Sequence, residues 1–164
     1  MGREQYGVTN GFTPDVAVIG QQVFNVTTPT FGIFISSGPQ RLILNRMRLC
    51  QAGSLAGGLV NIHITIDTAD RRSSGGVAIV PRNTNGGSSI AAKAVFLKNP
   101  TCLANGFGTR PISTEAKEAK LGDLTEYTGP LELWNTGSIL VYTFAQVTAP
   151  AWLFSFEWIE TELT

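Results

Sequence analysis

The chain has 164 residues, enough for one domain whose fold buries roughly 70% of the surface that the unfolded chain exposes. Its 12 basic and 12 acidic side chains cancel and make up only 15% of the residues, so no net charge attracts nucleic acid or an anionic membrane. The longest apolar run near the amino terminus is Val16 to Ile19, which predicts neither a signal peptide nor a membrane span of about 20 residues. We therefore expect a soluble, non-exported protein that meets its partners by shape and apolar contact.

The first predicted elements are short. Residues 1–20 are polar and contain glycine, a pattern that predicts an edge strand or an arm that orders only against a neighbour. Residues 21–164 are assigned to a single sandwich domain. Within them, Gln21 to Thr27 and Phe31 to Ile35 predict two strands, and Ser36 to Pro39 predicts the turn that follows.

Longer strands are predicted in the middle of the chain. Arg41 to Cys50 carries apolar side chains on both faces, which indicates a strand inside a sheet. Leu59 to Asp67 alternates strictly, with four β-branched side chains facing inward and polar side chains, His63 among them, facing out. Val77 to Pro81 predicts a short strand, and Ile90 to Leu97 is assigned to a strand although its alanines favour a helix.

The carboxyl-terminal part contains the clearest pattern. Thr114 to Leu121 predicts the one short helix, because glutamates lie near its start and lysines near its end. After a strand at Leu131 to Trp134, residues Ile139 to Glu160 predict a long hairpin with a turn at Pro150. One face of its second arm needs a second apolar layer to cover it, because it carries the large aromatic residues Trp152, Phe154, Phe156 and Trp158.

These elements together predict the fold class. About eight strands, at most one short helix and no βαβ rhythm indicate an all-β protein. The expected architecture is an antiparallel β-sandwich of jelly-roll type.

Few residues suit catalysis or ligand binding. His63 is the only histidine, and one imidazole falls short of the three or four ligands of a zinc site. The loop with Ser88 and Ser89 lacks the strand-turn-helix context of a nucleophile elbow, and no P-loop or complete dinucleotide motif occurs. We therefore expect no catalytic, cofactor-binding or metal-binding residues, and no enzyme.

The charged side chains are assigned to surface contacts. Glu157 and Glu160 fall on opposite faces of one strand, so they do not form a catalytic carboxylate pair, and a solvated strand end accounts for them. The arginines have no interleaved aromatic residues, which favours surface or subunit salt bridges over nucleic-acid binding. Cys50 and Cys102 follow no spacing motif and are expected to stay reduced. The candidate interface residues are Arg46, Arg48, His63, Arg71 and Arg72.

Three parts of the chain carry a resemblance to a known family. They are the strand Leu59 to Asp67 with the paired arginines after it, the segment Ala94 to Thr101, and the ending Trp152 to Trp158. Together they resemble the small jelly-roll head decoration, or cement, proteins of tailed bacteriophages, in which an apolar strand ends in an Asn-Pro-Thr-like turn and the chain closes with an aromatic strand. The similarity runs from about Arg41 to the end of the chain and transfers no residue-level site.

The resemblance implies a virion structural protein that is made in the host cytoplasm and located on the capsid surface. It implies a homo-oligomer, most often a homotrimer, that binds the major capsid protein, bridges neighbouring shell subunits and stabilises the shell. We expect residues 1–20 to make much of that contact. Two other functions stay open: a head-to-tail connector or tail component of the virion, and a carbohydrate- or receptor-binding module with Trp134 as its candidate exposed platform.

Overall fold

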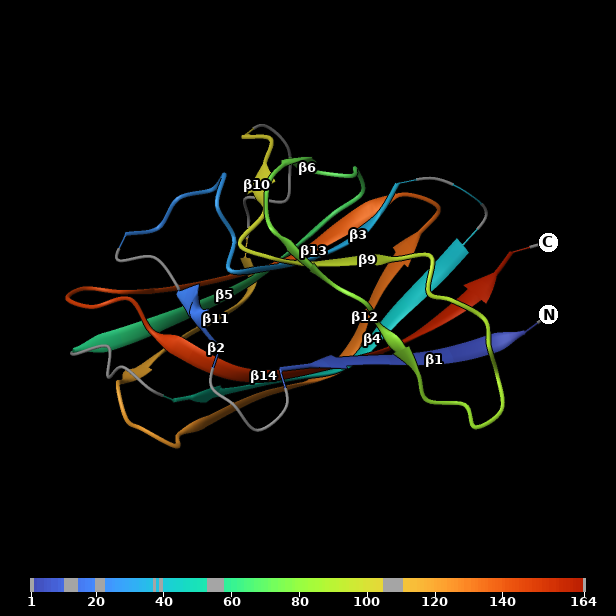
Figure 1. Ribbon diagram of the computed structural model, residues 1–164. Helices are drawn as coiled ribbons and strands as arrows, with labels where there is room; N and C mark the ends of the chain where they lie inside the picture. Colours follow the sequence, from blue (N-terminus) through green and yellow to red (C-terminus); the bar gives the residue numbers. More distant parts are fainter. Residues whose placement is uncertain are drawn as a thin grey trace.

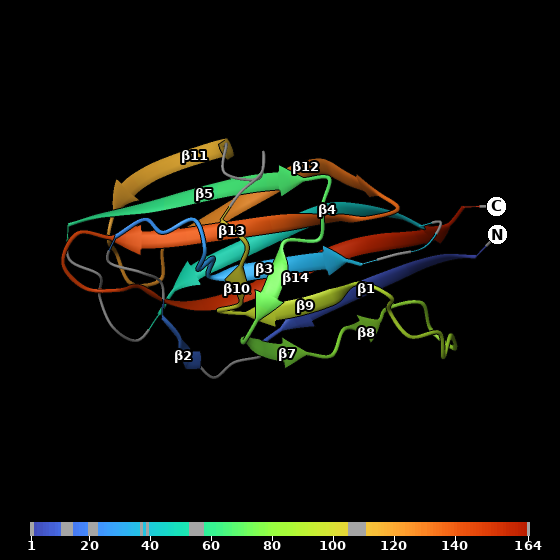
Figure 2. The ribbon, with the colours of Figure 1, turned by 90° about the horizontal axis from the view of Figure 1, so that it is seen from above.

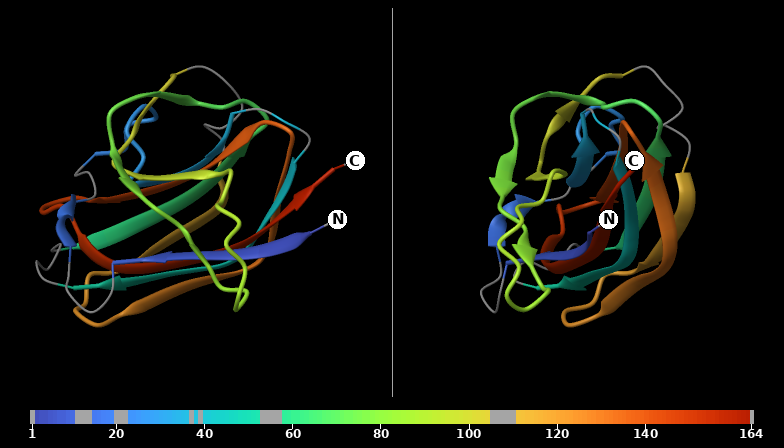
Figure 3. Two further views of the ribbon diagram at one scale, coloured as in Figure 1. Left: turned by 45° about the vertical axis from the view of Figure 1, so that its right-hand side comes forward. Right: turned by 90° about the vertical axis from the view of Figure 1, so that its right-hand side faces the viewer.

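The computed structural model describes residues 2–10, 15–19, 23–36, 38, 40–52, 58–104 and 111–163. This part of the chain forms fourteen strands and no helix. It therefore contains no helix that is long and apolar enough to cross a membrane. Two antiparallel sheets face each other across a core, and a two-stranded sheet lies beside them (Figures 1 and 3). The predicted all-β sandwich is confirmed.

Each of the two large sheets contains six strands. Sheet A has the order β12 (Leu124–Trp134), β4 (Gln40–Gln51), β14 (Ala151–Glu162), β1 (Arg3–Thr9) and β8 (Arg82–Asn83), and β2 (Asp15–Ile19) also pairs with β14. Sheet B has the order β11 (Pro111–Glu118), β5 (Leu59–Asp67), β13 (Gly137–Ala145), β3 (Phe31–Ile35), β9 (Val95–Lys98) and β7 (Val77–Ile79). The small sheet pairs β10 (Thr101–Cys102) with β6 (Arg72–Ser74).

Eight of the strands have the jelly-roll arrangement. Their spatial order is β1-β14-β4-β12 in sheet A and β3-β13-β5-β11 in sheet B (Figure 2). Along the chain they alternate between the two sheets except from β5 to β11, which pair with each other. This is the eight-stranded, double Greek-key order of a jelly roll, and the other strands are short additions to it.

The core lies between the sheets, and the aromatic face of β14 is at its centre. The exposed fraction of each of its four large aromatic side chains is at most 3%. Sheet B supplies the covering layer that the sequence predicts: the Phe31 ring centroid lies 4.8 Å from that of Phe154, and the Phe96 centroid lies 4.9 Å from that of Phe156. Such aromatic contacts contribute beyond the area that they bury.

β13 and β14 do not form the predicted hairpin. β13 pairs with β3 and β5 in sheet B, whereas β14 pairs with β1 and β4 in sheet A. The turn at Pro150 therefore crosses from one sheet to the other. Alternation assigns a face to each side chain, but it does not select the neighbouring strand.

The predicted helix at Thr114 to Leu121 is wrong. Ser113 to Glu118 pair antiparallel with β5 as part of β11. A segment this short is marginal as an isolated helix, and the free edge of β5 supplies ladder hydrogen bonds that override its weak propensity.

Other predicted elements differ in extent. Residues 23–30 form turns rather than the strand predicted over Gln21 to Thr27, of which Gln21 and Gln22 lie outside the described residues. The strand predicted at Ile90 to Leu97 begins only at Val95, whereas β3 and β5 have the predicted bounds. The turn predicted at Ser36 to Pro39 lies partly outside the described residues.

The amino-terminal segment is part of the sandwich. β1 pairs with β14 from Arg3 to Thr9 and with β8 at Tyr6 and Gly7, so strands flank it on both sides. Tyr6 is 1% exposed and Val8 is 4% exposed. Of residues 1–20, the described part is therefore an integral sheet strand with a short companion, β2, and not a free arm; Met1, residues 11–14 and Gly20 lie outside the described residues.

A bulge explains the two apolar faces of β4. Arg46 pairs with Glu157 and Leu44 pairs with Trp158, which leaves Asn45 as an extra residue in β4. The bulge reverses the alternation. Leu42 and Leu44 before it, and Met47 and Leu49 after it, consequently all point into the core.

An additional layer covers the outer face of sheet B. We call residues 23–30, 68–76 and 99–104 the outer layer; its strands β6 and β10 lie above β13 and β3 in Figure 1. Tyr142 of β13 donates its hydroxyl proton to the Val26 carbonyl at 2.8 Å. A second, smaller apolar cluster lies where this layer meets sheet B. It consists of Cys102 of the layer and Phe34, Leu97, Leu140 and Tyr142 of the sheet.

Candidate functional site

The five predicted interface residues lie in three separate places. Arg46 and Arg48 project from the outer face of β4 in sheet A. His63 lies on the outer face of β5 in sheet B, and Arg71 and Arg72 belong to the outer layer. The fold does not bring these residues together into one site.

The outer face of sheet A carries opposite charges on adjacent strands. Arg48 Nε donates to Glu126 Oε2 at 2.6 Å, and Arg46 lies 3.7 Å from Glu126 and 3.9 Å from Glu157. All four side chains are between 30% and 43% exposed. These are the surface salt bridges that the sequence predicts, and being exposed they contribute little to stability.

Trp134 is an exposed aromatic side chain at the end of β12. It is 52% exposed, and the Arg41 guanidinium carbon lies 5.0 Å from its ring centroid. Arg41 in turn donates two hydrogen bonds to Glu132, at 2.7 and 3.1 Å, and this contact lowers the pKa of that carboxyl. Trp134 is therefore exposed as the sequence predicts, with the Arg41 guanidinium over one side of the indole.

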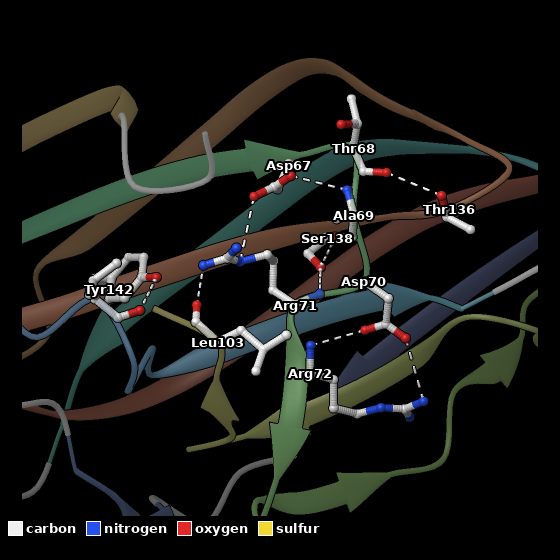
Figure 4. A network of polar contacts seen from close by, with 11 residues as sticks. Asp67, Thr68, Ala69, Asp70, Arg71, Arg72, Leu103, Thr136, Ser138 and Tyr142 are labelled. Atoms are coloured by element: carbon white, nitrogen blue, oxygen red, sulfur yellow. Dashed lines mark hydrogen bonds and ion pairs between the residues drawn. The ribbon is translucent and has the colours of Figure 1, made fainter. Parts of the chain in front are cut away.

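Arg71 is enclosed by its own chain. Its exposed fraction is 5%, its Nε lies 3.5 Å from Asp67 Oδ2, and its guanidinium donates to the Leu103 carbonyl (Figure 4). The Arg71 backbone N–H donates to Ser138 Oγ at 2.8 Å, and the Ser138 hydroxyl donates to the Ala69 carbonyl at 2.8 Å. This network joins the outer layer to β5 and β13, so the Arg71 side chain is a structural contact rather than a surface group.

Arg72 points away from that network. Its Nη2 lies 3.6 Å from Asp70 Oδ2, and its side chain is 35% exposed. It is the one guanidinium of the predicted pair that faces solvent (Figure 4).

His63 packs among aromatic rings. Its ring centroid lies 5.6 Å from that of Phe24 and 5.0 Å from that of Phe144. Partial burial there lowers the pKa of the imidazole, so the ring is neutral near pH 7. No group of three or more His, Cys, Asp or Glu side chains that suits a metal ion occurs among the described residues.

The two cysteines are free thiols. Cys102 of the outer layer is buried against sheet B, and burial raises its pKa to about 11. A thiol with such a pKa is not nucleophilic near neutral pH.

Glu160 is a buried carboxylate that the sequence reasoning assigned to a solvated strand end. It is only 7% exposed. Oε1 accepts from Trp158 Nε1 at 2.8 Å and from the Ala94 backbone N–H at 3.1 Å, and Oε2 accepts from the Lys93 backbone N–H at 2.8 Å. The alternation of β14 indicates this burial, because Glu160 lies on the same inward face as the aromatic residues before it.

A small hollow lies beside Glu160. Its volume is about 120 Å³, and its lining includes Glu4, Tyr6, Lys93 and Glu162. Burial, together with the negative charges of the two nearby glutamates Glu160 and Glu4, raises the pKa of Tyr6 to about 12. The Tyr6 hydroxyl is therefore protonated, and it donates to a backbone carbonyl.

The described surface consists of sheet faces and loops with small hollows rather than a deep cleft. A second hollow, beside Trp134, has a volume of about 180 Å³. Both hollows are smaller than the roughly 300 to 1,000 Å³ of typical small-molecule sites. The fold and these surfaces define a jelly-roll protein with exposed ion pairs on sheet A and two small hollows.

Comparisons with known proteins place the chain in no family. No protein-family model matches the sequence, and no curated protein matches it. The crystal structure of the infectious bursal disease virus VP2 subviral particle is weakly similar, with 17% identity, a TM-score of 0.25, and coverage of 99% of this chain and 41% of that chain. A mutant VP2 protein of the same virus, in derived T=1 particles, has 11% identity, a TM-score of 0.19, and coverage of 98% and 40%. The chain thus spans about two fifths of the length of these capsid proteins.

Proposed function

We propose that this chain is a virion structural protein that decorates the outer surface of a bacteriophage capsid. In this role it binds the major capsid protein, bridges neighbouring shell subunits as a homo-oligomer and stabilises the shell. The observation that carries the proposal is the outer face of sheet A, where Arg46, Arg48, Glu126 and Glu157 form an exposed charged lattice. Sheet B is less suited to this contact, because the outer layer covers much of its outer face.

The physical argument concerns specificity more than affinity. Charges on adjacent strands of a packed sheet have fixed spacing, so a partner with complementary charges binds in one orientation. Each exposed ion pair is weak, which suits a protein that binds through many copies to a repeating lattice. Binding that favours the assembled shell stabilises it by mass action.

Residues 3–9 belong to sheet A as strand β1, so they are not a separate arm that could bind the shell by itself. Deleting them removes β1, and with it Tyr6 and Val8, from the core. A deletion of that segment therefore tests folding and does not isolate a contact with the shell.

The experiment measures how many copies of the chain purified particles contain. A copy number comparable to that of the major capsid protein is expected, whereas a few copies indicate a connector or tail component, and absence from particles contradicts the virion role. The double variant Arg46→Ala/Arg48→Ala is expected to lower occupancy at low salt. Its difference from the wild type is expected to shrink at high salt, because salt screens the charges that the wild type still carries. Arg72→Ala removes an exposed arginine from the outer layer and is the matched control; equal losses in both variants contradict the role of sheet A.

Trp134 favours a second candidate function, a carbohydrate-binding module. Its half-exposed indole and the neighbouring Glu132 and Thr136 line the 180 Å³ hollow. Binding of the free protein on a glycan array, lost in Trp134→Ala, supports this function. A blank array contradicts it.

A further inference from the structure

We propose that two copies of this chain associate through β11, which pairs with β11 of the second copy about a two-fold axis at Ala116. The contact makes one continuous sheet from the two B sheets. It concerns the free protein and does not depend on the virion role.

β11 is the best-suited of the described sheet edges. It lies at the outer edge of sheet B (Figure 2) and is paired on its other side with β5. The edge strands β2, β7 and β8 are two to five residues long. β12 is longer, but its register shifts between Thr128 and Leu131, and Pro130 has no N–H to donate. From Ser113 to Glu118 the pairing of β11 with β5 is regular, so its outward N–H and C=O groups form an uninterrupted row that a second strand can join.

The charges on β11 favour one register, the one that places opposite charges across from each other. Side chains that oppose each other in an antiparallel pair lie on the same face, so a two-fold axis normal to the sheet lies midway between the two copies of one residue. An axis at Glu115 places two carboxylates opposite each other, and an axis at Lys117 does the same for two ammonium groups. With the axis at Ala116, Glu115 of each copy opposes Lys117 of the other, and opposite charges so placed stabilise a sheet whereas like charges destabilise it.

Lys117 is already held in position at this edge. Its Nζ lies 2.7 Å from Asp123 Oδ2 and donates to the Leu124 carbonyl at 3.2 Å. Its side chain remains 20% exposed, and that of Glu115 46% exposed, so both have surface available to a second copy. Glu115 Oε1 of the same chain lies 3.7 Å from this Nζ, so the carboxylate of a second copy would be the third beside the ammonium group. A cation held in this way loses little further side-chain freedom.

Exposed apolar side chains occupy both ends of the same edge. Ile112 is 46% exposed, and Leu121, just beyond β11, is 53% exposed. They lie just outside the regular segment Ser113 to Glu118, at its two ends, so in the register centred on Ala116 the Ile112 of each copy comes near residues 119–121 of the other. The pairing thus covers apolar surface at each end, which adds to the ladder hydrogen bonds.

A pair of lysine substitutions on one face tests the register. Ala116 and Thr114 are both exposed, so the fold tolerates a lysine at either position. Ala116→Lys places two ammonium groups opposite each other across the axis, where they repel. Thr114→Lys places each new lysine opposite Glu118 of the other copy, where the charges attract. Sedimentation velocity from about 10 to 500 μM is expected to show a concentration-dependent dimer in the wild type and in Thr114→Lys, and a monomer in Ala116→Lys. A monomeric wild type, or an oligomer that Ala116→Lys leaves intact, overturns the proposal.

Disulfide trapping provides a second, independent readout. Paired Cα atoms across an antiparallel ladder lie about 4.5 to 5.5 Å apart, within the range of a disulfide. In a Cys50→Ser background, Ala116→Cys is expected to form a covalent dimer on oxidation. Thr114→Cys is not expected to form one, because the two cysteines are offset along the strands by four residues, or roughly 14 Å. Equal cross-linking of both variants, or none at Ala116→Cys, contradicts the register.

Discussion

Replacement of Asp67 with alanine is expected to destabilise the protein more than any surface substitution. Asp67 and Arg71 are each 5% exposed, so removing the carboxylate leaves a buried guanidinium without its counter-charge (Figure 4). Breaking a buried pair from one side typically costs about 3 to 5 kcal/mol in free energy of unfolding.

The structure refines this magnitude. The guanidinium keeps its hydrogen bond to the Leu103 carbonyl, which places the cost toward the lower end of that range. Asp67 Oδ1 also accepts from the Ala69 N–H at 3.0 Å, and losing this bond adds about 1 kcal/mol. The double variant Asp67→Asn/Arg71→Met removes both charges. It is expected to lose less stability than the sum of the single variants Asp67→Asn and Arg71→Met, by about 0.5 to 3 kcal/mol.

Urea unfolding followed by tryptophan fluorescence measures these costs. Arg72→Ala is the control, because its exposed ion pair with Asp70 is expected to contribute less than about 0.5 kcal/mol. A cost below about 1 kcal/mol for Asp67→Ala, or strict additivity in the double variant, would refute the reasoning.

Three further predictions concern single side chains. Glu160→Gln is expected to cost about 1 to 3 kcal/mol of unfolding free energy. The carboxylate accepts hydrogen bonds from backbone N–H groups, and the amide nitrogen of a glutamine cannot accept one. Trp152→Phe is expected to cost a similar amount, about 1 to 3 kcal/mol, because it removes the buried hydrogen bond from Nε1 to Thr143 Oγ1 at 3.0 Å. Burial holds the pKa of His63 below its ordinary value of 6.5, so the unfolded state binds the proton first as the pH falls. The wild type is therefore expected to lose stability as the pH falls below about 6.5, and His63→Phe is expected to show a flatter profile between about pH 7 and 5.

Each of these predictions has a contrary result in the same unfolding assay. Full stability of Glu160→Gln would mean that the glutamine amide makes hydrogen bonds as favourable as those of the carboxylate. An unchanged midpoint for Trp152→Phe would mean that water or another group satisfies the hydroxyl of Thr143. Parallel pH profiles for the wild type and His63→Phe would assign the pH dependence to other groups.

The sequence alone determined the strands and their inward faces wherever the alternation is strict. β5 has the predicted bounds, and the aromatic face of β14 is buried as expected, because side chains of a strand alternate between faces whatever its neighbours are. The same rule located Glu160 on the inward face. Its burial was missed because a carboxylate at a strand end suggests solvent, and the backbone N–H groups of Lys93 and Ala94 that bind it are distant in sequence.

Only the tertiary structure decided which strands pair, what covers their faces and where the alternation breaks. Ladder hydrogen bonds join residues far apart in the chain, so no local pattern shows that β13 and β14 belong to opposite sheets or that Thr114 to Glu118 complete sheet B as a strand. The bulge at Asn45 exists because the strands beside β4 fix its register on both sides of it. Arg71 is buried for the same reason: the outer layer folds over sheet B and encloses a side chain that the sequence places in a polar loop.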